Sequence, residues 1–138
     1  GNLGNYIMAA TPFFFFFFEV KPWAREVNEG FKAMTGDDLS VVSAMAYTDL
    51  YVMAEALERA GSRDRQKLQS TLRNIEITSG NAMLLAAEKI AFNEKGENPY
   101  QRMLIGQIID KEWEIVYPEE YKLPGVEIVW PWPPWSDR

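Results

Sequence analysis

The side chains available for chemistry in this sequence are carboxylates, amides, hydroxyls and aromatic rings, because the chain contains neither histidine nor cysteine. That composition excludes histidine-based acid–base catalysis, cysteine nucleophiles and the usual zinc ligands. Two pairs could be drawn as an acid and a base, Tyr47 with Asp49 and Glu55 with Glu58. The two glutamates fall on the polar face of a predicted helix, where a charge pattern usually serves solvation. We therefore predict a protein that is not an enzyme.

An acidic loop at residues 93–97 raises the question of calcium. Glu94 and Glu97 supply its carboxylates, and the ligand spacing of an EF-hand is absent. A solvated turn explains the loop better, because Asn93 can bond its own backbone. We predict no metal site and no cofactor.

Residues Phe13 to Phe18 are six consecutive phenylalanines. They cannot share one buried face, because consecutive residues of a helix or a strand point in different directions. One interpretation is an aromatic wall for a ligand, and a second is a partly buried loop. A third is that these residues were assigned where the true identity was unknown.

The composition is that of a folded globular domain with an acidic balance of charge. The chain has 138 residues, of which 47% are hydrophobic and 25% charged, and its net charge is −6. This length suffices for one domain with a hydrophobic core. An acidic chain without a basic run is a poor binder of nucleic acid or of anionic membranes, so we predict no nucleic-acid partner.

The longest apolar run, Met8 to Phe18, is too short to cross a membrane. No charged segment precedes it, so the run does not have the form of a signal peptide.

Hydrophobic periodicity and turn residues predict a chain of helices and strands. The predicted helices are 21–35, 40–61 and 63–74, and the predicted strands are 5–11, 103–109 and 112–117. Asp110 and Lys111 form a two-residue turn between the last two strands. Residues 82–87 have no clear period and are predicted to be irregular. The tail from residue 131, rich in proline and tryptophan, can form neither a helix nor a central strand.

The helix predicted at 40–61 is the clearest, with capping oxygens before it and Gly61 placed to end it. Its predicted apolar face consists of Val42, Met45, Ala46, Met53, Ala56, Leu57 and Ala60. The corresponding stripe of the helix at 21–35 consists of Trp23, Val27, Phe31 and Met34.

Several segments carry a resemblance to a known family. Residues 46–49 (AYTD) and 54–62 (AEALERAGS) resemble the "AYDA…AEALERAGS" helix of type I periplasmic substrate-binding proteins of the Leu/Ile/Val-binding type, which serve ABC transporters. Residues 89–96 (KIAFNEKG) are similar to the family's "I.FDEKG", a short strand followed by a turn. The segment 107–118 resembles its "QI.DGK…VYP" hairpin, with Lys111 where the family commonly has glycine. A tight turn there often needs positive φ, so we expect local strain or a different turn type.

The resemblance implies an α/β chain with the type I periplasmic-binding-protein fold, present as the C-terminal pieces of both lobes. It assigns residues 1–37 to the second lobe, 38–102 to the first, 103–117 to a hairpin returning to the second, and 118–138 to a tail that crosses back. Parallel strands of such sheets are buried on both faces, so a partial sheet leaves apolar faces and strand edges open. We therefore expect the chain to pack on another chain or on the remaining N-terminal part of the same receptor.

The function implied by the resemblance is amino-acid transport, in which a periplasmic receptor passes its solute to the membrane permease of an ABC transporter. Two lobes close about a hinge and bury an amino acid, an amide or a small aromatic acid. A periplasmic protein needs a signal peptide, so we expect that it was removed or that the N-terminal part of the protein is absent.

Two places match positions that line the ligand cleft of the family. One is the start of the central helix, Val42, Ser43 and Ala44, and the other is the loop after the first strand, from Thr11 to Phe13. Family members that bind aliphatic amino acids often carry an aromatic side chain near Ala44, so a small residue leaves room for a bulkier ligand. Ordinary packing at a helix start or a strand end is an equally good explanation for each residue.

A second function of a different class is an interaction module. The proline- and tryptophan-rich tail would then dock a partner with an aromatic groove. On this hypothesis, deletion of residues 124–138 abolishes partner binding and leaves solute binding intact.

Overall fold

The computed structural model describes residues 4–14, 18 and 20–137, and its helices and strands make it an α/β protein, as predicted. Phe15, Phe16 and Phe17 of the phenylalanine run lie outside the described residues. The chain divides into two compact units. Unit 1 consists of Gly1–Asp38 and Met103–Arg138, and unit 2 is the continuous segment Leu39–Arg102. The assignment of these segments to receptor lobes stays a prediction.

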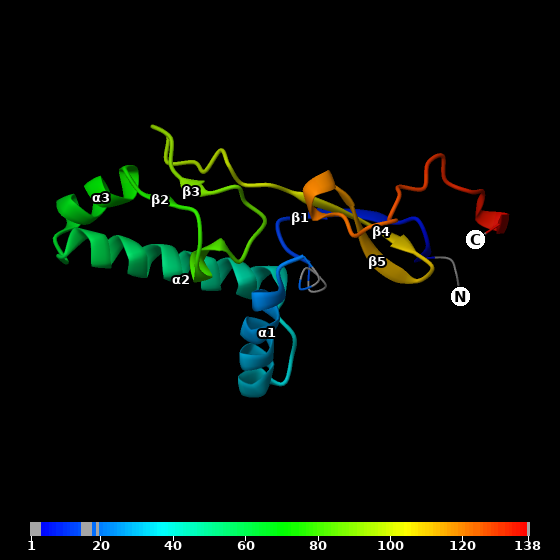
Figure 1. The fold of residues 1–138 in the computed structure, drawn as a ribbon, viewed down its shortest axis with the longest axis horizontal. Coiled ribbons are helices and arrows are strands. Elements are labelled where there is room, and N and C mark those ends of the chain that lie inside the picture. The colour runs from blue at the N-terminus through cyan, green and yellow to red at the C-terminus, as the bar shows by residue number, and fades with distance from the viewer. Residues whose placement is uncertain (1–3, 15–17, 19, 138) are drawn as a thin grey trace. The chain divides into compact units, whose positions relative to one another are not determined.

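Unit 1 contains a three-stranded antiparallel sheet in the order β1–β4–β5 (Figure 1). β1 is Met8–Thr11, β4 is Leu104–Ile109 and β5 is Glu112–Tyr117. Met8 lies opposite Gln107, and Ile109 lies opposite Glu112 at the end of the hairpin. The predicted hairpin of residues 103–117 is confirmed, since β4 and β5 are antiparallel neighbours joined by a two-residue turn. β1 also runs antiparallel to β4, so these three described strands differ from the parallel strands that the resemblance associates with the family's sheets.

For the hairpin turn between β4 and β5, the sequence predicts either local strain or a different turn type, and the structure shows positive φ without glycine. Asp110 and Lys111 both have positive φ, 51° and 74°. Two such residues match the twist of the flanking strands. The Lys111 amide donates to Oδ1 of the buried Asn5, at 2.9 Å. Asn5 and its neighbours form a turn, so β1 begins at Met8 and not at residue 5.

Gly106 in β4 allows two aromatic rings to lie against the strand. A Cβ atom at this position would come within 2.6 Å of Phe14 and 3.1 Å of Trp113. The two rings are themselves in contact, with centroids 5.6 Å apart. Phe14 therefore packs on unit 1 as part of a partly buried loop, and Phe13 is also buried.

Helix α1, Pro22–Thr35, starts with the expected proline and ends at Gly36, whose φ is 87°. The predicted stripe is wrong in part. Trp23 and Met34 are 38% and 81% exposed, whereas Ala24 and Asn28 are the buried residues. Val27 and Phe31 of the predicted stripe are half-buried, so the buried face overlaps the predicted one and is shifted toward Ala24 and Asn28.

The tail belongs to unit 1. Its backbone at Val129 is held by the fully buried side chain of Gln107 in β4. The Val129 amide donates to Gln107 Oε1 at 2.9 Å, and Gln107 Nε2 donates to the Val129 carbonyl at 3.2 Å. Two short 3₁₀ turns, η4 at Glu119–Tyr121 and η5 at Trp135–Asp137, are the helical structure described in this segment.

Unit 2 starts with two capped helices. Ser40 and Ser43 form a reciprocal capping box before α2, Val41–Ala60, which ends at the left-handed Gly61. Asp64 caps α3, Arg65–Arg73, by accepting from two backbone amides. The antiparallel pair β2, Glu76–Ile77, and β3, Ile90–Ala91, follows, with a 3₁₀ turn η3 at Asn81–Met83 between them. Residues 82–87 are wholly buried although they are largely irregular, as predicted.

The buried face of α2 differs from the predicted one. The residues that are buried, at a spacing of four, are Ala44, Thr48, Val52 and Ala56. Of the predicted face, Val42, Met45, Met53 and Leu57 are 71%, 45%, 41% and 39% exposed. The helix is apolar on more sides than unit 2 covers, so periodicity alone could not select the buried side.

None of the described helices combines the length and the apolar character that crossing a membrane requires.

Replacing Gly106 by alanine should destabilise the full chain by about 1–3 kcal/mol, because the added methyl group must displace the Phe14 and Trp113 rings. Gly30→Ala is the matched control, since a Cβ there meets nothing within 4 Å. That change should stabilise α1 by about 0.5–1 kcal/mol. Urea unfolding followed by tryptophan fluorescence measures both, and equal effects of the two variants would contradict the packing at Gly106.

Lys111→Gly should stabilise the chain by about 1 kcal/mol, because glycine adopts positive φ without the penalty of a side chain. Lys95→Gly provides the comparison, since Lys95 lies in an exposed loop without positive φ. A thermal unfolding midpoint that falls in Lys111→Gly would refute the turn geometry.

Candidate functional site

The two predicted cleft residues of unit 1 lie side by side after β1. The Thr11 hydroxyl donates to the Phe13 carbonyl at 3.1 Å and lies 3.4 Å from the Phe13 amide. Phe13 is 2% exposed. The hydroxyl of Thr11 thus shapes the local turn, and the ring of Phe13 is packed inside the protein.

The three predicted cleft residues of unit 2 lie in the first turn of α2. Val42 is exposed, and Ala44 is completely buried. The Ser43 hydroxyl accepts from the Ser40 amide at 2.8 Å and lies 3.0 Å from the Ser40 carbonyl, so it serves the cap. Of the three side chains, Val42 is therefore the one best placed to reach a solute. The role of all five residues in ligand binding stays a prediction.

The acid–base pairs considered in the sequence have other partners. Glu55 pairs with Arg59 at 2.8 Å, one helical turn away. The Tyr47 ring lies against Tyr51, with centroids 4.6 Å apart. These contacts are ordinary interactions along a helix surface.

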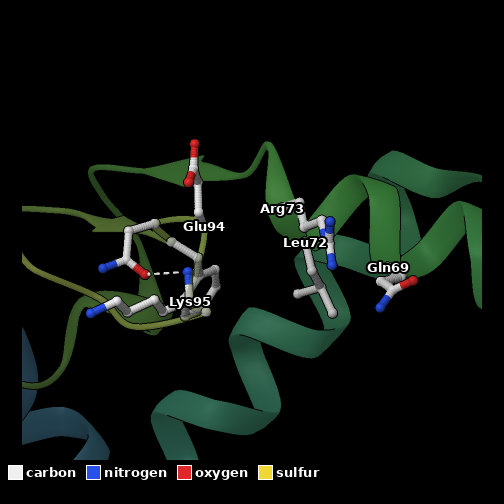
Figure 2. A pocket seen from close by; sticks show the side chains of 8 residues that line it. Gln69, Leu72, Arg73, Glu94 and Lys95 are labelled. Atoms are coloured by element: carbon white, nitrogen blue, oxygen red, sulfur yellow. Dashed lines mark hydrogen bonds between the residues drawn. The ribbon is translucent and has the colours of Figure 1, made fainter.

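A pocket of about 310 Å³ lies between α3 and the loop after β3 (Figure 2). Its lining includes Leu72, Arg73, Glu94 and Lys95, the last two from the loop considered for calcium. The Asn93 side chain organises that loop by accepting from the amides of Lys95 and Glu97, at 2.9 and 3.0 Å. Within the described residues no group of three metal-ligating side chains comes together.

A second pocket of unit 2, of about 400 Å³, lies between α2 and the segment around β3. It is lined mainly by apolar side chains and includes the buried Thr48, whose hydroxyl has no hydrogen-bond partner in the described part of the chain. None of the five predicted cleft residues lines either of these two pockets. Thr48 was not predicted from the sequence to be a buried residue of α2. Its spacing of four residues from Ala44 and from Val52 was the available signal.

Two charged groups at the ends of α1 have altered acidity. Hydrogen bonds from Asn28 Nδ2, at 2.8 Å, and from Lys32 Nζ hold the pKa of Asp38 below its usual value of 3.8. These bonds join the last turns of α1 to the segment that follows the helix. At the other end of α1, burial lowers the pKa of Lys21 to about 8, so its amine is partly neutral near that pH.

No protein-family model matches the chain, and no curated protein sequence matches it. Among solved structures, the chain is similar to the leucine-binding protein LivK of Thermotoga maritima, with a TM-score of 0.58 and 21% sequence identity. The similarity covers 81% of this chain and 30% of LivK. The chain therefore has the fold of part of a type I periplasmic binding protein, as the sequence resemblance predicts.

The pKa of Asp38 gives a pH prediction. Because this pKa is lower in the folded chain than in the unfolded chain, the stabilisation is complete at neutral pH and is lost as the pH falls below about 4. Asp38→Asn should therefore lower stability at pH 7 and make less difference at pH 3, as measured by urea unfolding. Asp37→Asn is the control, because the Asp37 carboxylate has no hydrogen bond among the described residues. A penalty for Asp38→Asn that is the same at both pH values would contradict the assignment.

Proposed function

We propose that this chain is part of a non-catalytic, periplasmic solute-binding receptor of an ABC transporter. The receptor binds an amino acid, an amide or a small aromatic acid between two lobes and passes it to the membrane permease. The observation that carries the proposal is the fold, which matches part of a leucine-binding protein over 81% of the chain.

The division of the chain into two units supports the same proposal. Unit 2 interrupts unit 1, so the chain passes from one unit to the other and returns. Proteins that close on a ligand by a hinge move two bodies about a few connecting residues. The connections near residues 38 and 103 are the candidate hinge segments, and Val42 follows the first of them by a few residues.

The proposed receptor also includes the remaining N-terminal part, because this chain spans 30% of the length of LivK. The purified material should then contain a second polypeptide, or this sequence should form part of a longer one. Native mass spectrometry beside denaturing mass spectrometry measures this directly. A folded monomer with a mass of 15.9 kDa would contradict this partner.

Solute binding tests the function itself. A panel of amino acids, amides and aromatic acids should contain a ligand that raises the melting temperature of the assembled protein, because a ligand that binds only the folded state stabilises it. Val42→Trp should then weaken that ligand's affinity at least tenfold, measured by calorimetry. Leu50→Trp is the matched control, being a similarly exposed apolar residue of α2. If no solute of the panel binds, the proposed function fails.

The second candidate, an interaction module, is favoured by the exposed tail. Trp130, Trp132 and Trp135 are 69%, 43% and 63% exposed, and the first two rings meet edge to face at 5.3 Å. Deletion of 124–138 is a poor test, because it leaves the buried Gln107 without its partner Val129. The variant Trp132→Ala/Trp135→Ala preserves that contact. On this hypothesis it loses partner binding and retains solute binding.

A further inference from the structure

The pocket between α3 and the loop after β3 combines an apolar floor with polar walls (Figure 2). Leu72 and Phe92 supply the apolar surface, and both side chains are partly buried against the hydrophobic core of unit 2. Gln69 and Arg73, one turn apart on α3, and the loop at 93–96 supply the polar groups. The volume of about 310 Å³ is at the lower end of the usual range for small-molecule sites. The pocket therefore has the size and the composition of a site for a small amphipathic molecule.

Arg73 brings to this pocket a guanidinium that forms neither a hydrogen bond nor an ion pair with any described residue. An arginine in the last turn of a helix often bonds the terminal carbonyl groups. Asn74 performs that role here, because its side-chain amide donates to the Ser70 carbonyl at 2.8 Å and its backbone amide donates to the Thr71 carbonyl at 3.1 Å. The guanidinium is thus free to bind a ligand, and its planar set of donors fits a carboxylate through two parallel hydrogen bonds.

The loop opposite α3 is held in place by Asn93. Its Oδ1 accepts from the Lys95 and Glu97 amides, and its Nδ2 donates to the Glu97 carboxylate at 3.0 Å. The other carboxylate of the loop, that of Glu94, points away from α3 in Figure 2. Within the described structure neither carboxylate pairs with Arg73. The loop is therefore ordered in advance of any ligand, which lowers the entropic cost of binding.

The helix beside the pocket is basic although the chain is acidic. α3 contains three cations, Arg65, Lys67 and Arg73, and no carboxylate, whereas the net charge of the chain is −6. None of the three forms an ion pair with another described residue. A concentration of positive charge on one element raises the local concentration of anions. The charge of this surface therefore favours an anionic ligand over a neutral or a cationic one.

We propose that this pocket is a binding site for a small carboxylic acid with an aromatic body. The carboxylate binds the Arg73 guanidinium and accepts a further hydrogen bond from the Gln69 side-chain amide. The aromatic body lies on Leu72 and against the ring of Phe92, a contact that aromatic pairs favour beyond the area they bury. The site is independent of the proposed function, because its lining belongs entirely to unit 2 and includes none of the five predicted cleft residues.

Titration of the isotope-labelled full chain with 3-phenylpropionate, followed by NMR, tests the site. The amide signals of residues 69–73 and 92–96 should shift and saturate together. 3-Phenylpropionamide is the matched ligand, because it has nearly the same shape without the charge, and its affinity at these signals should be about tenfold lower. Absence of saturable shifts in the two segments, or equal affinities for the acid and the amide, would overturn the proposal.

Arg73→Gln tests the charge at the pocket. It should weaken 3-phenylpropionate binding about tenfold, because the glutamine amide cannot replace a charge-assisted pair of hydrogen bonds. Lys67→Gln is the matched control, since it removes the same charge from the same helix at an exposed residue outside the lining of the pocket. Its affinity should stay within about twofold of the unchanged chain, because exposed charges that do not contact the ligand are screened. Equal losses in the two variants would mean general attraction by α3 and would overturn the role of Arg73.

Gln69→Trp tests the space. Because Gln69 is exposed and lines the pocket, the indole ring should fill it without disturbing the core, and 3-phenylpropionate should then bind at least about tenfold more weakly. Ser70→Trp is the control, at an exposed neighbouring position outside the lining. Thermal unfolding midpoints confirm that both variants are folded. Equal affinities of the two variants for 3-phenylpropionate would overturn the proposal.

Discussion

Unit 1 depends on the central strand β4, which needs hydrogen-bond partners on both edges and side-chain packing on both faces. Its backbone pairs with β1 on one edge and β5 on the other. Gly106 admits two aromatic rings on one face, and Gln107, the next residue, points to the opposite face because side chains alternate along a strand. There the side-chain amide of Gln107 forms two hydrogen bonds with the backbone of Val129. These bonds let a tail without regular structure lie against a buried strand. Two adjacent residues thus position the aromatic loop and the tail.

The sequence predicts well those features that depend on a few neighbouring residues, such as helix caps and tight turns. The caps at Ser40 and Gly61, the proline at the start of α1 and the two-residue hairpin turn each act through local geometry, so the elements lie where they were expected. The buried faces of α1 and α2 were predicted less well, because α2 is apolar on several sides and only tertiary packing selects one. The antiparallel pairing of β1 with β4 joins distant segments, and periodicity contains no information about such a partner.

The residues of the candidate site also differ in how far local sequence predicts them. Sequence motifs directed attention to the beginning of α2 and the end of β1, and the structure describes the capping bonds and the buried ring at those places. The unpartnered hydroxyl of Thr48 and the paired amide of Gln107 were not found, because a polar residue in an apolar run has meaning only when its surroundings are known. A helix position spaced by four from two buried residues was the available signal for Thr48.

The pairing of β1 with β4 also determines when unit 1 can fold during synthesis. Met8 pairs with Gln107, so the first strand leaves the ribosome roughly 100 residues before its neighbour, which corresponds to about 5–20 s at ordinary rates of translation. Unit 2 is continuous and is complete within that interval. Its contacts are local enough to form first, whereas the sheet of unit 1 closes a long loop and is slow for entropic reasons. The nascent chain therefore carries β1 without its partner strand while unit 2 folds behind it.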